Sequence, residues 1–182
     1  MALENWNIDT VHSTIGFTVR HLMVSKVHGL FTKWEGTFAF DEETPASSRV
    51  EVKIDVASVD TREPQRDAHL RSGDFFEAEK FPHITFKSTA VERAKDDHFK
   101  VTGDLTMRGV TRSVVLDVEF AGRQAHPQMG ERAGFSARAS INRKDFGVSF
   151  NQVLDTGGLA VSEKVDINID IEATRAAAVQ AA

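Results

Sequence analysis

The chain of 182 residues contains no cysteine and no tyrosine, and it has only four prolines. The lack of cysteine excludes disulfides, thiolate nucleophiles and cysteine-based zinc sites. Basic residues are also outnumbered, since 22 Lys and Arg stand against 27 Asp and Glu and give a net charge of −5. Electrostatic binding of nucleic acid needs the opposite sign, so we expect no nucleic-acid partner.

Long apolar runs are missing as well. No stretch approaches the roughly 18 apolar residues that a transmembrane helix requires, and the first residues, which include the acidic Glu4, lack the pattern of a secretory leader. We therefore expect no membrane span and a cytoplasmic location. With 41% apolar and 27% charged residues, the composition is that of a globular domain with a sizeable core.

Hydrophobicity alternates with a period of two along most of the chain, which is typical of half-buried β-strands. Turn-forming residues separate most of the alternating segments. Between the third and fourth segments, Pro64 and Gly73 frame a short helix. The sequence predicts an all-β fold, an eight-stranded antiparallel up-and-down barrel with a short helical insertion between strands 3 and 4. The eight predicted strands are residues 15–21, 34–40, 50–56, 83–92, 99–107, 113–120, 135–143 and 165–171.

We predict one barrel domain over residues 1–175. The last ten residues, from Ala173, are rich in alanine, and we expect a frayed tail at residues 176–182. Eight strands enclose an interior that side chains can fill or that can hold one small ligand. The pattern alone leaves both outcomes open.

The order of the strands predicts where the barrel opens. In an up-and-down barrel the connections that leave the odd strands meet at the same rim, and three of these four connections are long, residues 22–33, 59–82 and 144–164. Long loops at one rim are typical of the entrance to a ligand cavity. His21 and Arg143 end the inward faces of two strands at this rim. We predict that they form a polar collar at the mouth of an apolar tunnel; the alternative is that both side chains face solvent.

The inward faces of the predicted strands supply the other candidate ligand-binding residues. Small inward residues are expected to leave room in the bore where large ones would fill it; they are Gly36, Gly103, Ala137 and Ala139. The large apolar wall candidates are Ile15, Phe17, Val19, Trp34, Phe38, Phe40, Val52, Ile54, Phe86, Val101, Met107, Phe135, Ile141 and Ile167.

Motifs of enzyme chemistry are absent from the sequence. It contains no glycine-rich phosphate loop, no Gly-x-Ser-x-Gly elbow and no histidine pair at metal-binding spacing. Strand carboxylates such as Asp117 and Glu119 alternate with apolar residues and so lie on the solvated face. We predict no catalytic residue, no metal and no cofactor.

An ordered set of short motifs runs from about Trp6 to Thr174. The motifs are Trp6-x-Ile8-Asp9-x-x-His12-Ser13-x-Ile15, Val27-x-Gly29-x-Phe31, Phe75-Phe76 with Phe81-Pro82-x-Ile84-x-Phe86-x-Ser88, Gly103-x-Leu105-Thr106-x-Arg108-Gly109 and Arg143-x-Asp145-Phe146-Gly147. In this order they resemble the YceI-like family. The resemblance implies an extended lipocalin-like barrel, often dimeric, that holds a long apolar lipid such as an isoprenoid quinone, a polyprenyl chain or a fatty-acid-type amide. Many members are secreted behind a signal peptide, a feature that this sequence does not show.

Three functions follow as hypotheses. The favoured one is non-enzymatic binding, storage or transport of a polyisoprenoid or fatty-acid-type lipid in the barrel, with a homodimer expected from the family. The second is an enzyme that acts on such a lipid with His21 as acid or base. The third is a ligand-free structural or stress-response barrel whose interior is filled.

Overall fold

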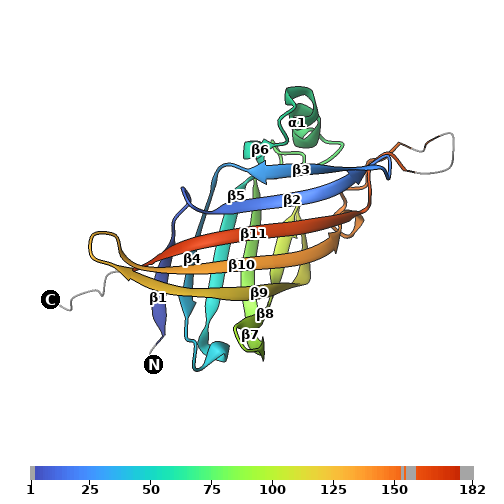
Figure 1. Cartoon of the computed structure of the whole chain (residues 1–182). Helices are drawn as coiled ribbons and strands as arrows, with labels where there is room; N and C mark the ends of the chain where they lie inside the picture. The colour runs from blue at the N-terminus through green and yellow to red at the C-terminus, as the bar shows by residue number, and fades with distance from the viewer. Residues whose placement is uncertain (1–2, 153, 155–158, 177–182) are drawn as a thin grey trace.

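The computed structural model of the protein describes residues 3–152, 154 and 159–176. Within these residues strands dominate, and one short α-helix projects from the barrel (Figure 1). The strands are β1 (Glu4–Ile8), β2 (Thr14–His21), β3 (Ser25–Phe31), β4 (Trp34–Phe40), β5 (Arg49–Asp55), β6 (Val59–Asp60), β7 (His83–Lys95), β8 (His98–Met107), β9 (Val110–His126), β10 (Gly130–Asn142) and β11 (Lys164–Arg175). The helices are α1 (Pro64–Arg71) and the 3-10 turns η1 (Pro45–Ser47), η2 (Val56–Ser58) and η3 (Arg143–Phe146).

Three pairs of strands each share one position of the barrel. β1 and β2 lie end to end along β11, since Ile8 pairs with Ala173 and Thr14 pairs with Asp170. β3 and β4 lie end to end against β2 and β1, and β5 and β6 lie against β4 and β3 in the same way. β1 pairs with both β4 and β11, which closes the sheet. The described strands therefore occupy eight positions of a closed antiparallel barrel, which confirms the predicted fold class.

The turn between β2 and β3 corrects the prediction of a long loop over residues 22–33. The turn takes only Leu22 to Val24, and β3 follows it directly. Leu22 and Met23 have φ angles of 51° and 60°, the left-handed conformation that Gly, Asn or Asp usually supplies in hairpin turns. Because two apolar residues make this turn, the sequence carries no turn signal there.

The predicted helical insertion is confirmed as α1. Pro64 stands at its first turn, and the Glu63 carboxylate accepts a hydrogen bond from the Gln65 backbone N–H at 3.1 Å, which caps the helix. Buried Asp67 ties the helix to the strand before it, because its Oδ1 accepts from both the N–H and the hydroxyl of Thr61 at 2.8 and 2.6 Å. Among the described residues, no helix combines the length and the apolar character needed to cross a bilayer.

The two ends of the barrel differ. At the end that we call the helix end lie the β2–β3 turn, α1, the β8–β9 turn and the segment that follows β10 (Figure 1). At the opposite end lie the start of β1, the end of β11 and the turn between β9 and β10 (Figure 1). Each end has its own apolar cluster: one around Val56, Phe75 and Phe146 near the helix end, and one around Trp6, Phe40 and Phe99 near the opposite end.

The C-terminal region is ordered further than its alanine content suggests. Ala173 is fully buried in β11, and the Ala176 N–H donates to the Asn5 carbonyl oxygen at 2.9 Å. Pairing with β1 therefore holds the chain as far as Ala176, the first residue of the predicted tail. The remainder of the predicted tail, residues 177–182, lies outside the described residues.

Candidate functional site

An apolar cavity of about 500 Å³ occupies the inside of the barrel. Residues of nearly every barrel strand line it, from Ile8 and Phe40 near the opposite end to His21 and Arg143 near the helix end. Ligand sites are typically cavities of about 300 to 1,000 Å³ with mainly apolar walls and a few polar groups. The interior is thus hollow, and the size and lining fit one elongated apolar molecule.

Most of the residues that alternation selected contribute to the wall of this cavity. Their side chains face inward because the strand pleat sends every second residue to the same side. Of the sequence-predicted site residues, those that line the cavity are Ile15, Phe17, Val19, His21, Phe38, Phe40, Val52, Ile54, Phe86, Val101, Met107, Phe135, Ala137, Ile141, Arg143 and Ile167.

Trp34, Gly36 and Ala139 do not line the cavity. Trp34 and Ala139 pack instead against the apolar cluster near the helix end. At Gly36 the space is taken by neighbours, since an added Cβ would lie 2.8 Å from Ile8 Cδ1. The alternation therefore did not predict which inward positions border the hollow.

Gly103 shows that a small inward residue need not widen the bore. The ring of Phe86 lies over it, so that a Cβ at Gly103 would stand 2.4 Å from Phe86 Cζ. Phe17 covers Gly29 in the same manner, at 2.2 Å. Both rings line the cavity. The expectation that Gly103 leaves room for a ligand is wrong, because the glycine makes room for an aromatic wall residue.

Packed aromatic rings form the floor of the cavity near the opposite end. The ring centroid of Phe40 lies 5.6 Å from that of Phe99 and 5.4 Å from that of Phe135, with edge-to-face geometry in both pairs. Phe38 meets Phe135 edge-on at 5.2 Å. Such pairs add about 0.5–1.5 kcal/mol each beyond the area that they bury. We call Phe38, Phe40, Phe99 and Phe135, which all line the cavity, the aromatic floor.

The candidate site residues predicted from the sequence did not include those that cover the cavity at the helix end, which we call the roof. Phe75 and Phe76 of the insertion line the cavity, together with Val148 and Phe150 of the segment after β10. The rings of His69, Phe75 and Phe150 lie within 5.0 to 5.3 Å of one another, which joins the two segments. The Phe75-Phe76 pair beside an otherwise polar helix was the signal in the sequence that could have located this roof.

Arg143 has a different role from the predicted collar. Its side chain is only 4% exposed, and burial holds its pKa below the usual value for a guanidinium. Nη1 donates to the carbonyl oxygens of Val148 and Phe150 at 2.7 and 2.9 Å, and Nε donates to that of Ser162 at 2.9 Å. Arg143 lines the cavity at the predicted rim, but most of its N–H donors bond to backbone carbonyl oxygens of the segment that follows β10.

Most of the other polar wall residues also lie at the helix end, whereas Ser48 and Arg49 line the cavity at the opposite end. Arg66 is engaged, since its Nε and Nη2 donate to the hydroxyl and carbonyl oxygens of Thr61 at 2.7 and 2.8 Å. Arg20 and His21 are both exposed, and their side chains form no hydrogen bond or ion pair with any residue in the described part of the chain. Gln152 at the same end is also exposed, and its side chain has no partner among the described residues, as is true of Arg49 at the opposite end. At the helix end, the groups available to a ligand's polar end are therefore Arg20, His21 and Gln152.

Comparison with known proteins identifies the family of this barrel. A model of the YceI-like domain matches residues 6–173. The chain belongs to the YceI-like family. It is 42% identical to the protein YceI of Escherichia coli O17:K52:H18 over 161 residues, which are 88% of this chain and 81% of that one. This finding confirms the resemblance that the sequence motifs indicated.

Solved structures show the same architecture. The crystal structure of Burkholderia cenocepacia BcnA matches with a TM-score of 0.82 at 27% identity, over 92% of this chain and 99% of that chain. A polyisoprenoid binding domain from Saccharophagus degradans matches with a TM-score of 0.66 at 15% identity, over 96% of this chain and 100% of that chain. At that identity the second match speaks for the fold alone.

The motif residues Asp9, His12 and Ser13 of this YceI-like chain hold the break between β1 and β2 against β11. Ser13 Oγ accepts from the Glu172 N–H at 2.9 Å and donates to the Glu172 carbonyl oxygen at 3.2 Å. Asp9 Oδ1 accepts from the backbone N–H of Val11 and His12 at 3.0 and 3.3 Å. These bonds replace the strand ladder where the chain turns away from it.

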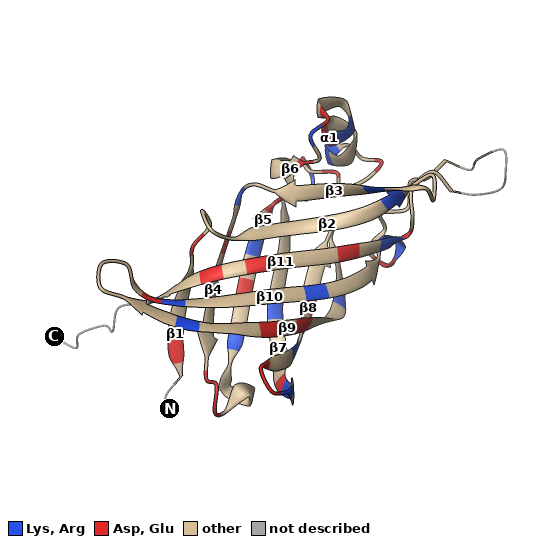
Figure 2. Ribbon diagram, in the orientation of Figure 1, with Lys and Arg blue, Asp and Glu red and all other residues tan. Residues whose placement is uncertain are grey.

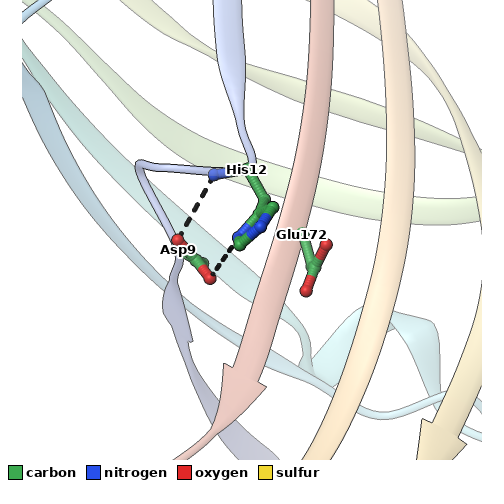
Figure 3. Close-up of side chains that lie close together, drawn as sticks. All are labelled: Asp9, His12 and Glu172. Atoms are coloured by element: carbon green, nitrogen blue, oxygen red, sulfur yellow. Dashed lines mark hydrogen bonds and ion pairs between the residues drawn. The ribbon is translucent and has the colours of Figure 1, made fainter. Parts of the chain in front are cut away.

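Asp9, His12 and Glu172 offer ligand atoms within 4.8 Å of one another, an arrangement that would suit a metal ion (Figure 3). The guanidinium of Arg132 already forms ion pairs with both carboxylates, because its Nη1 lies 2.7 Å from Asp9 Oδ2 and 3.0 Å from Glu172 Oε1. Hydrogen bonds from His12 and Arg132 lower the pKa of Asp9, and the bond to Asp9 raises the pKa of His12. We interpret the group as an ion-pair network that secures the strand break.

The motif residue Arg108 fastens the roof. It stands in the tight β8–β9 turn with a φ angle of 50°. Its Nη1 donates to the carbonyl oxygens of Phe75 and Gly147 at 2.7 and 3.3 Å, and its Nη2 lies 3.5 Å from Glu77 Oε2. Arg108 therefore connects the insertion and the segment after β10 to the same barrel turn.

Proposed function

We propose that this protein binds one long apolar lipid, a polyisoprenoid such as an isoprenoid quinone or a polyprenyl chain, and stores or transports it without chemical change. The observation that carries this proposal is the apolar cavity of about 500 Å³ inside the closed barrel. Membership of the YceI-like family supports it, as does the shared fold with a domain described as polyisoprenoid binding.

The cavity's chemistry fits a hydrocarbon chain. Burial contributes about 0.8 kcal/mol for each methylene, so one five-carbon isoprene unit contributes roughly 3 to 4 kcal/mol. Association and ordering cost some 4 to 15 kcal/mol, which about one to five buried units offset. Discrimination along the chain would be weak, because one methylene more or less changes the affinity little.

We propose that the tail of the lipid rests on the aromatic floor and that its head lies at the helix end. Most polar wall residues lie at that end, where Arg20, His21 and Gln152 are exposed and their side chains form no hydrogen bond or ion pair with the described residues, whereas the opposite end offers only Arg49 in this way. A head group with an oxygen acceptor could take hydrogen bonds there, while the hydrocarbon chain would meet Phe40, Phe99 and Phe135. The location in the cytoplasm and the homodimer stay predictions from sequence and family.

The enzymatic alternative has less support. It requires a proton-transferring group beside the lipid, with His21 as the candidate. A catalytic histidine is usually oriented by a carboxylate or a carbonyl oxygen, whereas the His21 imidazole contacts none among the described residues. Turnover of an isoprenoid lipid that a His21→Ala variant loses would favour the enzyme over the carrier.

Native mass spectrometry of protein purified without detergent from its own host tests the proposal. We expect a species heavier than the bare chain by the mass of one polyprenyl lipid, which is released when the protein is denatured. A bare mass in repeated preparations, together with no uptake of added geranylgeraniol, would favour the ligand-free structural barrel instead.

A further inference from the structure

The turn between β2 and β3 exposes three consecutive apolar side chains. Leu22 is 40% exposed, Met23 is 59% exposed and Val24 is 81% exposed. Leu22 and Met23 also adopt positive φ angles of 51° and 60°, a conformation that disfavours residues with a side chain beyond glycine. An Asn-Gly pair would make this turn at lower cost and would not expose apolar surface. The stability of the fold therefore does not explain these residues.

This apolar tip, Leu22–Val24, adjoins the cavity. The Leu22 N–H donates to the Ala160 carbonyl oxygen at 2.9 Å, and His21 pairs with Val161. His21, Ala160 and Val161 all line the cavity at the helix end. A surface that receives the tip would consequently lie against the end of the cavity where most polar wall residues lie.

Two basic residues stand at the base of the tip. Arg20 and Lys26 lie directly opposite each other on β2 and β3, and like charges in that relationship destabilise a hairpin. Neither forms an ion pair within the described part of the chain, although the charge of Lys26 is felt at Asp166. Figure 2 shows blue, the colour of Lys and Arg, at the ends of β2 and β3 that adjoin the tip. The nearby acids Glu163 and Asp166 are paired with Lys144 and Lys164, at 3.1 and 3.5 Å.

We propose that the apolar tip inserts into the surface of a lipid bilayer that contains anionic phospholipids. Apolar side chains flanked by basic ones are the combination that binds such a surface, since the first enter the acyl boundary and the second face the phosphates. Docking in this orientation brings the helix end of the cavity to the membrane. The delivery of lipid through this contact rests on the proposed function, whereas the contact itself is measured separately.

Sedimentation with vesicles of equal parts phosphatidylcholine and phosphatidylglycerol tests the proposal. A Leu22→Asn, Met23→Gly double variant introduces the favoured turn pair, so its thermal midpoint should equal or exceed that of the wild type. We expect its vesicle partitioning to fall about tenfold or more, because two apolar side chains no longer enter the bilayer. Lys26→Gln should lower partitioning about fivefold, which corresponds to about 1 kcal/mol for one basic residue at an anionic surface.

The matched control is Met129→Asn. Met129 is also an exposed turn residue, at 54%, but it lies in the β9–β10 turn at the opposite end of the barrel. Its replacement should leave partitioning unchanged. Equal losses of vesicle partitioning in the Met129 variant and the tip variant would overturn the proposal. A wild-type protein that does not sediment with the vesicles would overturn it as well. A dimer that the tip variant dissociates, without vesicle binding, would assign the tip to contact between two copies.

Binding of geranylgeraniol in buffer without vesicles separates this proposal from the function on which it rests. The tip variant should bind the free isoprenoid as the wild type does and lose only its partitioning to vesicles. Vesicle binding without any isoprenoid binding would leave the membrane contact standing and contradict the lipid carrier.

Discussion

The guanidinium of Arg143 donates to the carbonyl oxygen of Val148 at 2.7 Å from a side chain that is almost completely buried. The same Nη1 atom reaches the carbonyl oxygen of Phe150, and Nε reaches that of Ser162. One side chain thus satisfies backbone acceptors on two stretches of the segment that roofs the cavity. The integrity of the roof should depend on it.

Replacement of Arg143 by Met should lower the free energy of unfolding by about 2–4 kcal/mol, because one buried and several partly buried carbonyl oxygens lose their donor. Arg143→Lys should not restore the loss, since an ammonium cannot reproduce the planar array of donors. Chemical denaturation of the three proteins measures both effects.

Lys144→Met is the matched control for Arg143. Lys144 is the next residue, and its ammonium lies 3.1 Å from the Glu163 carboxylate on the exposed side. Exposed ion pairs contribute about 0–1 kcal/mol. Loss of similar stability in the Lys144 and Arg143 variants would contradict a special role for the buried guanidinium.

Gly103→Ala should destabilise the barrel by about 1–3 kcal/mol, as overpacking of a filled site does. A Cβ at this position would lie 2.4 Å from Phe86 Cζ and 2.7 Å from the Lys87 carbonyl oxygen, so the ring must shift and the backbone must yield. Gly73→Ala is the control, since nothing lies within 4 Å of a Cβ there. If Gly103→Ala melts at the temperature of the Gly73 variant, Phe86 does not depend on that glycine.

Stability should depend on pH through Asp9 and His12. The pKa of His12 is raised above 6.5, so its contribution is complete below pH 6.5 and is lost as the pH rises through the raised value. The pKa of Asp9 is lowered from 3.8, so its contribution is present above pH 3.8 and is lost as the pH falls through the lowered value. The pair therefore stabilises the strand break most between about pH 4 and 6.5.

His12→Gln should remove the loss of stability toward alkaline pH, while the loss at acid pH remains because Arg132 still bonds to Asp9. The difference in unfolding free energy between the wild type and the variant should be greatest near pH 5 and should shrink toward alkaline pH. Asp9→Asn provides the second arm of a double-mutant cycle, which isolates the coupling between the two side chains. A difference that stays constant from pH 5 to pH 9 would show that His12 acts only through its shape.

The alternation of apolar and polar residues was sufficient to predict the barrel, because a half-buried strand requires it. Val50, Val52 and Ile54 on one face of β5, with Lys53 on the other, illustrate how directly the pattern encodes the inward face. The same reasoning placed His21 and Arg143 at one end of the cavity, since strand direction in a meander decides which connections share a rim.

Other features had no signal in a single sequence. The Leu22-Met23 turn uses apolar residues at positive φ, so β3 was predicted as part of a loop. Gly103 was predicted to leave room in the bore, but the Phe86 ring lies over it, and no feature of the sequence indicates this contact. Arg143 looked like a ligand-facing charge, and its acceptors belong to a segment whose path depends on tertiary packing.

The central claim, that the hollow barrel holds a lipid chain, is tested most directly by filling the hollow. Ala137 lines the cavity on β10, between Val118 and Ile169 on the neighbouring strands, and Ala137→Phe would place a ring inside it. Val115→Phe adds similar bulk on the outer face of β9, where Val115 is exposed. Equilibrium binding of geranylgeraniol should weaken about tenfold or more in the Ala137 variant and stay unchanged in the Val115 variant, with both folded by circular dichroism. Wild-type affinity in a folded Ala137→Phe protein would contradict lipid binding inside the barrel.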